Sequence, residues 1–374
     1  MHGERANEGP RPARREELDD LADLMVACFG GALGPRRRRR RPRWIQRSGA
    51  WVIARDGRLV SHIRLVYNFL SIYGCRVKIA SIGGVCTHPD YRNHGLASLL
   101  LEHCAVVARE AGASLLLISG RRGLYRRAMA VDAVPIFRTR IGRGSIETRN
   151  GAPRARPGRP EDWAACARLY QAEPVRFVRV AEVFARALGG HGHRMPWVIE
   201  SRGDVVAYVV LARDWGHPPE SRERWVSEYA GVRGALVAGI PSLLEAANVD
   251  EIEFRAPQCD RELDYLLGNA GLRLGEGTLW EHTIRLLDLP LLMRRLRPYT
   301  VARLPREAAR ALAFEQTAEQ CMFTRGEDAL GLDIGKATAL VLGGPEAPRV
   351  GAELGESLNA LFPIPFPLPG MNYV

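Results

Sequence analysis

The sequence predicts an α/β (α+β) protein with mixed central sheets, built as two similarly ordered units followed by a smaller third unit. Three observations predict this architecture. Helix-like and strand-like patterns alternate along the whole chain. The same order of helix, strands, helix and strand occurs over residues 12–150 and, more loosely, over 160–286. A length of 374 residues exceeds one ordinary core and suits two or three domains.

The first unit is expected to begin with a helix over Glu16–Phe29, where apolar residues recur at helical spacing before Gly30-Gly31. Residues 51–86 then have the pattern of three antiparallel strands, with turns at Asp56-Gly57 and Tyr73-Gly74. The remaining elements expected in this unit are a helix from Leu96, a buried strand over Ser114–Ser119, a short helix around Tyr125 and a strand pair through Ile146.

A segment rich in proline, glycine and arginine near residue 150 marks the end of the first unit. In the second unit we expect a helix from Glu161, strands over 197–201, 205–213 and 225–231, a helix over 242–248 and a strand over 251–257. The third unit is expected to be helical over 289–299 and strand-like over 329–344. The predicted domains are therefore 1–150, 151–286 and 287–374.

The net charge of +11 suggests a nucleic-acid partner at first sight, but the composition argues against one. All but two of the 53 basic residues are arginine, a skew that a GC-rich coding sequence explains more simply. The run Arg36–Arg41 together with Arg43 supplies seven of the positive charges, and the rest of the chain carries only +4. We interpret the run as a solvated loop, with docking of an acidic partner or attraction of an anionic cofactor as alternatives.

The cysteines and the apolar segments indicate a cytoplasmic protein. The seven cysteines are scattered and never form a C-x-x-C pair, which predicts reduced thiols and no metal site. No apolar run approaches the ~18 residues of a membrane span. The first residues have no apolar core of a signal peptide, so we expect neither secretion nor a membrane partner.

The segment "RNHGLASL" has features of a diphosphate-binding loop. Arg92-x-x-Gly95-x-Ala97 fits the pattern [Q/R]-x-x-G-x-[G/A] and lies directly before a helix. A helix N-terminus has unpaired N–H groups and about half a positive charge. Small residues at Gly95 and Ala97 let the backbone approach a diphosphate, and Arg92 and Ser98 add donors. The preceding Gly83-Gly84 pair predicts a bulge that separates this strand from its neighbour and frees backbone groups for an extended amide-bearing ligand.

The residues from Val85 to Ala97, V-x-T-x-P-x-Y-R-x-x-G-x-A, resemble the acyl-CoA-binding motif of the GNAT N-acetyltransferase superfamily. In that family the strand pairs with the pantetheine amides and the loop holds the pyrophosphate of CoA. The resemblance implies that acetyl-CoA is the acyl-donor substrate. The residues expected to bind it are Val85, Thr87, Arg92, Asn93, Gly95, Leu96, Ala97 and Ser98.

The same resemblance implies a general acid. The segment "SGRRGLYRRAMAV" matches the GNAT position at which a tyrosine often protonates the sulfur of CoA, which makes Tyr125 the candidate. An ordinary phenol, with a pKa of ~10, is protonated at neutral pH and suits this role. The family often has a Gly-Phe pair after this helix, whereas this chain has Met129-Ala130-Val131. We expect the backbone N–H of Val85 to stabilise the oxyanion.

A side-chain base is harder to identify, because residues 77–87 contain no carboxylate. His62, His88 and Asp90 lie near the loop in sequence, and we interpret each as a turn or surface residue. The last 18 residues contain no charged side chain and include four prolines. An apolar tail of this kind is expected to dock in a groove, which would carry the terminal carboxylate of Val374 to a fixed place.

The tail and the repeated units are similar to those of the Eis (enhanced intracellular survival) family. That family has tandem GNAT folds, the second degenerate, and a small α+β sterol-carrier-like C-terminal domain. The resemblance implies that Val374 supplies the catalytic base, that the third unit is a scaffold for the tail, and that the protein is a homo-oligomer, as family members form hexamers. It also implies primary-amine acceptors, either aminoglycosides or lysine side chains of peptides.

The second unit lacks the [Q/R]-x-x-G-x-[G/A] pattern and is not expected to bind CoA. It is expected to wall the acceptor pocket, with Glu228 as a contact to a cationic acceptor or, equally, as a structural carboxylate. Two other functions stay open. A non-catalytic module that binds CoA or a partner would not need Tyr125. A transferase that uses aminoacyl-tRNA would suit the basic charge, although the intact loop argues against it.

Overall fold

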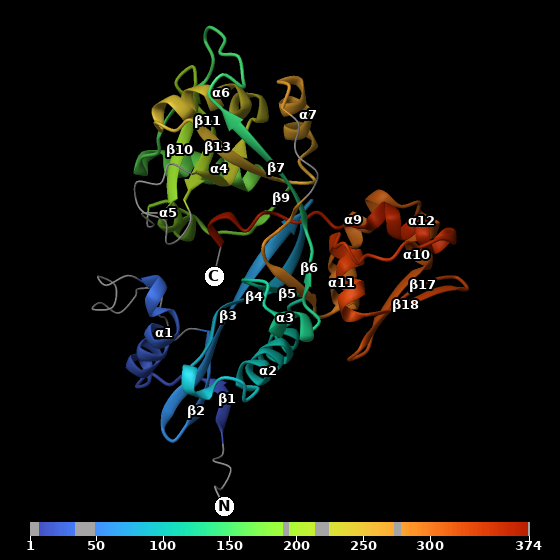
Figure 1. Cartoon of the computed structure of the whole chain (residues 1–374). Helices are drawn as coiled ribbons and strands as arrows, with labels where there is room; N and C mark the ends of the chain where they lie inside the picture. The colour runs from blue at the N-terminus through green and yellow to red at the C-terminus, as the bar shows by residue number, and fades with distance from the viewer. Residues whose placement is uncertain (1–6, 34–48, 190–193, 214–223, 273–277, 373–374) are drawn as a thin grey trace, which may run out of the picture.

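A computed structural model of the chain describes residues 7–33, 49–189, 194–213, 224–272 and 278–372. Over these residues the strands form two large mixed sheets and one small antiparallel sheet. The large sheets lie one above the other in Figure 1, and the small sheet with its helices lies beside them. None of the helices in the described ranges combines the length and the apolar character that crossing a membrane requires.

The first large sheet has the strand order β1-β2-β3-β4-β5-β15-β6. Its strands are β1 (Glu8–Pro12), β2 (Ala50–Arg55), β3 (Arg58–Ile72), β4 (Cys75–Thr87), β5 (Leu115–Ile118), β15 (Thr283–Leu286) and β6 (Val131–Asp132). The β2–β3 and β3–β4 turns have positive φ at both central residues, as two-residue hairpins of right-handed twist require. Helix α2 (Leu96–Glu110) connects β4 to the parallel strand β5 and buries its apolar stripe on the sheet.

The second large sheet repeats this order of elements. Its strand order is β14-β7-β13-β12-β11-β10-β8. The strands are β14 (Thr278–Leu279), β7 (Pro135–Gly142), β13 (Glu251–Pro257), β12 (Trp225–Gly231), β11 (Asp204–Ala212), β10 (Arg194–Ser201) and β8 (Arg154–Pro157). The helices are α4 (Trp163–Ala172), α5 (Ala181–Gly189), α6 (Arg233–Ala246), which connects β12 to the parallel strand β13, and α7 (Arg261–Asn269).

Three strands belong to one predicted residue range but pair in the large sheet that the other range forms. Strand β7 pairs with β13 in the second sheet, although residues 135–142 precede the predicted boundary at 150. Strand β15 fills the place beside β5 in the first sheet, although residues 283–286 belong to the predicted second range. Strand β9 (Val175–Phe177) pairs with the far end of β3. The division of the molecule by sheet therefore differs from its division by residue range.

The third unit shares its core with the first sheet. Its elements are α8 (Leu289–Arg295), α9 (Arg297–Arg303), α10 (Arg306–Ala311), β16 (Leu312–Gln316), β17 (Gln320–Arg325), β18 (Asp328–Asp333), α11 (Ile334–Leu342) and α12 (Ala352–Leu361). The prediction of a strand over 329–344 is wrong beyond Asp333, because that residue caps a helix by accepting from the Lys336 N–H at 2.8 Å. Every residue of helix α11 except Lys336 is buried, so its sequence has no polar face that would mark it as a helix.

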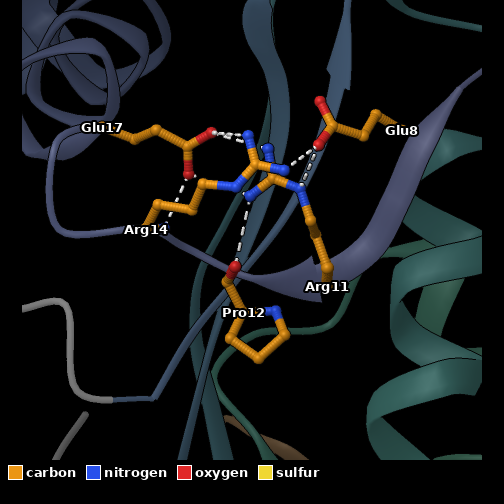
Figure 2. Close-up of polar contacts among 5 residues, drawn as sticks. All are labelled: Glu8, Arg11, Pro12, Arg14 and Glu17. Atoms are coloured by element: carbon orange, nitrogen blue, oxygen red, sulfur yellow. Dashed lines mark hydrogen bonds and ion pairs between the residues drawn. The ribbon is translucent and has the colours of Figure 1, made fainter.

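An ion-pair cluster fixes the start of helix α1 (Leu18–Leu33) to β1. The guanidinium of Arg11 donates to Glu17 at 2.6 and 2.9 Å and to Glu8 at 3.0 Å, and Arg14 also pairs with Glu8 (Figure 2). Further along the helix, the Met25 sulfur lies 3.6 Å from the Cys86 sulfur on β4. The cluster thereby holds the helix that covers the end of β4, where the candidate site begins.

Candidate functional site

Strand β4 contains the predicted bulge and separates from β5 at the predicted place. The register of β3 and β4 leaves Gly84 and Val85 together opposite Ile63. Gly84 has a φ of +61°, which favours glycine. The parallel pairing of β4 with β5 ends at Ile82 and Ile118. From Gly83 onward β4 therefore pairs with β3 on one side and diverges from β5 on the other.

His62 supports the bulge from the neighbouring strand. Its side chain is buried, and its Nδ1–H donates to the Gly84 carbonyl at 3.0 Å. Burial lowers the pKa of His62 to about 4, so the ring is neutral at neutral pH. The interpretation of His62 as a turn or surface residue is therefore wrong. His88, by contrast, does lie in a turn, where its ring accepts from the Asp90 N–H at 3.4 Å.

The folded protein binds a proton at His62 less readily than the unfolded chain does. The contribution of neutral His62 to the free energy of unfolding is therefore complete above pH ~6.5 and falls as the pH drops toward 4. The loss from this one group should reach about 2–3 kcal/mol at pH 4.5. Urea unfolding at pH 7 and 4.5 checks this, since His62→Asn should show a smaller acid loss than wild type. The exposed His94→Asn is the control, and an equal acid loss in His62→Asn and wild type would contradict the assignment.

The loop after β4 is held by several contacts to Thr87. The Thr87 hydroxyl lies 3.0 Å from the Ser61 hydroxyl. The Thr87 carbonyl accepts from the Cys28 thiol at 3.3 Å and from Arg92 Nε at 3.4 Å. A short 3₁₀ helix, η1 (Pro89–Tyr91), then leads to the start of α2. These contacts fix the direction in which the loop approaches the helix.

The N-terminus of α2 is open to a ligand. Gly95 is its N-cap residue, with a φ of +72°, and provides no side chain that would occupy the first helical N–H groups. No acidic residue stands in the first turn, and Arg92, Asn93 and Gly95 are exposed. Such an end attracts an anion through its N–H groups and its dipole. The Leu96 side chain is buried in the core, so only its backbone N–H faces this end.

Tyr125 lies on helix α3 (Gly123–Arg127) and is 2% exposed. Its ring belongs to the same apolar cluster as Val85, Leu96 and Ile118, and it lies 3.6 Å from the Cβ position of Gly120, which follows β5. The helix ends as the chain turns through Met129, which has a φ of +58°. The structure therefore brings together Tyr125 and the residues predicted to bind the acyl donor.

A small cavity of about 20 Å³ lies where β4 and β5 separate. It is lined from both strands, from β9, from the segment that precedes β15 and from the C-terminal tail. The lining residues are Ser81, Ile82, Leu117, Ile118, Ser119, Phe177, Trp280, His282, Pro369 and Asn372. Burial lowers the pKa of His282, which keeps this ring neutral as well. A larger cavity of about 290 Å³ shares no lining residue with it and lies along the tail at residues 359–366.

Most residues that line this cavity are not indicated by any sequence pattern. Phe177, Trp280 and His282 fall in the range assigned to the second unit and reach the first sheet only through the exchanged strands β9 and β15. Asn372 arrives from the opposite end of the chain. In the sequence, only the absence of charged side chains from the tail indicates that Asn372 reaches a buried site. Within the described residues, no group of three or more His, Cys, Asp or Glu side chains is arranged to hold a metal ion.

From Leu361 to Asn372 most residues of the tail are buried, as expected of a docked tail, and Pro363 is exposed. It leaves the third unit and crosses to the junction of the two large sheets, which is the red segment of Figure 1. Ile364 and Phe366 are each 3% exposed, and the Ile364 N–H donates to the Val341 carbonyl at 2.8 Å. Val374, the predicted base, lies outside the described residues, as does the run Arg36–Arg41.

Glu228, predicted as a contact to the acceptor or as a structural carboxylate, occupies a structural position. It is 6% exposed on β12. Its two oxygens accept hydrogen bonds from Arg179, from the Tyr208 hydroxyl and from the Met371 N–H. The carboxylate is therefore engaged with the second unit and the tail, and does not face the small cavity.

Comparison with known proteins agrees with this geometry. Residues 9–128 match the family model described as an acetyltransferase (GNAT) domain, which supports an acyltransferase. These residues include β2 to β5, all of β1 except Glu8, the loop and Tyr125. None of the curated proteins compared with the chain matches its sequence.

Solved structures match over nearly the whole chain. A GCN5-related N-acetyltransferase from Anabaena variabilis is similar with a TM-score of 0.62 at 13% identity, covering 95% of this chain and 96% of that one. A GCN5-related N-acetyltransferase from Kribbella flavida has a TM-score of 0.62 at 16% identity, covering 96% of both chains. Eis1 from Mycobacterium abscessus has a TM-score of 0.59 at 16% identity, covering 91% of this chain and 90% of that one. At these identities the likeness establishes a shared fold.

Proposed function

We propose that the protein is an acetyl-CoA-dependent N-acetyltransferase that transfers an acetyl group directly to primary amines. The observation that carries the proposal is the separation of β4 from β5 after Ile82, directly before a helix N-terminus with no capping side chain. Such an arrangement offers backbone groups to an extended amide chain and positive potential to its diphosphate. Acyl-CoA has both parts in one molecule.

In this proposal the diphosphate of CoA lies at the backbone N–H groups of residues 95–98, with Arg92 beside it. The pantetheine amides pair with the free side of β4 from Gly83 onward. The thioester then reaches the point where the two strands separate. There the N–H of Val85, in the bulge that His62 supports, donates to the carbonyl oxygen as it gains negative charge.

The reaction needs one bond to form and one to break. The neutral amine attacks the thioester carbon, which becomes tetrahedral while its oxygen becomes an oxyanion. Collapse of this intermediate breaks the C–S bond and leaves an amide. The Tyr125 hydroxyl gives its proton to the departing thiolate, and a base takes the proton that the nitrogen loses. The products are the N-acetylated amine and free CoA.

We assign the base to the terminal carboxylate of Val374. The support is the course of the tail, since Pro369 and Asn372 line the small cavity and Asn372 is only two residues before Val374. The third unit is then a scaffold that directs the tail to this place. The acceptors we propose are cationic amines, such as aminoglycosides or lysine side chains, because a carboxylate near the reacting nitrogen attracts and deprotonates an ammonium group.

The test is release of free thiol from acetyl-CoA across a panel of an aminoglycoside, polyamines and a lysine peptide. A chain lacking Val374 should lose kcat by about a hundredfold, because its carboxylate is displaced by one residue. Val374→Ala is the matched control and should keep its rate, since it retains a terminal carboxylate at the same position. Full activity in the shortened chain would remove the carboxylate from the mechanism. Binding of CoA with no turnover on any amine would favour a non-catalytic module instead.

A further inference from the structure

We propose that Arg179 and Glu228 are positioning residues, which fix the C-terminal segment Gly370–Asn372 against the cavity where β4 and β5 separate. The contribution of the second unit to the reaction is then to hold the tail of the chain in the site of the first unit. This inference rests on the proposed function in one respect, namely that acyl transfer takes place at this cavity.

The pair is buried and geometrically complete. The side chains of Arg179 and Glu228 are 2% and 6% exposed. The two guanidinium nitrogens donate to the two carboxylate oxygens at 2.8 and 2.6 Å, the parallel arrangement that Arg forms best with a carboxylate. The guanidinium also lies 4.2 Å from the centre of the Tyr170 ring, and the Tyr208 hydroxyl donates to Glu228 at 2.8 Å. Both charges are thereby held in one orientation.

The same two residues bind the tail. The Met371 N–H donates to Glu228 Oε2 at 3.0 Å, and Arg179 Nε donates to Asn372 Oδ1 at 2.9 Å. The Met371 side chain packs in the apolar cluster of the second unit with Tyr170 and Tyr208. Asn372 in turn lines the small cavity of the first unit. Arg179 of the pair is thus hydrogen-bonded directly to a residue that lines the candidate site.

Gly370 shows how closely the tail approaches the pair. A Cβ atom built at this position would lie 2.2 Å from Glu228 Oε2, and its φ is +51°. A side chain there would collide with the carboxylate and displace the tail from it, while both residues of the pair are retained. Gly370→Ala therefore separates the position of the tail from the folding of the second unit, which substitutions of the buried pair do not.

The experiment compares Gly370→Ala with Gly351→Ala in the full chain. Gly351 precedes α12 in the same unit and has nothing within 4 Å of its Cβ position and a φ of −97°. We expect Gly370→Ala to lower kcat on the order of a hundredfold while the KM for acetyl-CoA changes by less than about threefold, because a displaced catalytic group costs rate without costing donor binding. Gly351→Ala should match wild type. A kcat of Gly370→Ala within about threefold of wild type would overturn the proposal.

Two further readouts separate the possible failures. Hydrogen exchange of a peptide that covers residues 370–372 should be faster in Gly370→Ala and in Glu228→Gln than in wild type. Unchanged exchange overturns the proposal even if no amine is acetylated, whereas absence of turnover in wild type contradicts the proposed function alone. In a chain that ends at Pro369, Glu228→Gln should have no further effect on kcat, because the tail that it positions is gone. An additional loss in that background also overturns the proposal.

Discussion

Tyr125→Phe should lower kcat for acetyl transfer by about a hundredfold to a thousandfold and leave acetyl-CoA binding nearly unchanged. The substitution removes one oxygen atom and keeps the ring, which is 2% exposed and packs against the core of the first unit. The fold should therefore be retained, while the thiolate of CoA would leave without a proton. Initial rates of thiol release, together with calorimetric binding of acetyl-CoA, measure the two effects separately.

Tyr265→Phe serves as the control for this substitution. Tyr265 is 69% exposed on α7 in the second unit, and it lies outside the residues that line either cavity. Its replacement should leave both kcat and binding at the wild-type level. A kcat for Tyr125→Phe within about threefold of wild type would show that another group protonates the leaving thiolate.

Gly95→Val should weaken acetyl-CoA binding by about tenfold to a hundredfold. A valine would stand at the open N-terminus of α2, where we propose that the diphosphate binds, and it would resist the φ of +72° that this position adopts. The loss of one charge-assisted hydrogen bond, at ~1.5–3 kcal/mol, corresponds to this range. Titration calorimetry with acetyl-CoA gives the Kd directly.

Gly144→Val is the control that measures the effect of backbone strain at a position outside the loop. Gly144 has a φ of +80° and open space around its Cβ position, as Gly95 does, but lies in the turn after β7 in the second sheet. Both variants should lose comparable stability, and only Gly95→Val should lose acetyl-CoA binding. Equal binding in the two variants would contradict the assignment of the loop to the diphosphate.

The elements that the sequence predicted well are those that local patterns determine. The hairpin turns at Asp56-Gly57 and Tyr73-Gly74 and the helix after Gly95 depend on residues next to one another in the chain. The candidate binding loop was predictable for the same reason, since one continuous segment contains the bulge, the turn and the helix start. Tyr125 was assigned through the resemblance of its segment to the GNAT superfamily, and it lies on the short helix expected after β5.

The features that the sequence did not predict depend on distant partners. An alternating strand such as Pro135–Gly142 fits either sheet, and only its pairing with β13 decides which sheet it joins. His62 was misjudged because its burial depends on α1 and on the bulge in β4. Arg179 gave no signal among so many arginines, although it is one of the buried polar residues.

The exchange of β7 and β15 also limits how this architecture can change over evolutionary time. If a gene duplication produced the two large units, each unit now contributes a strand to the large sheet of the other. Neither unit can therefore be replaced on its own. A recombination event near codon 150 would leave the gap beside β5 unfilled and a strand of the first segment without a sheet. Exchange of either half alone would therefore remove a strand from each large sheet.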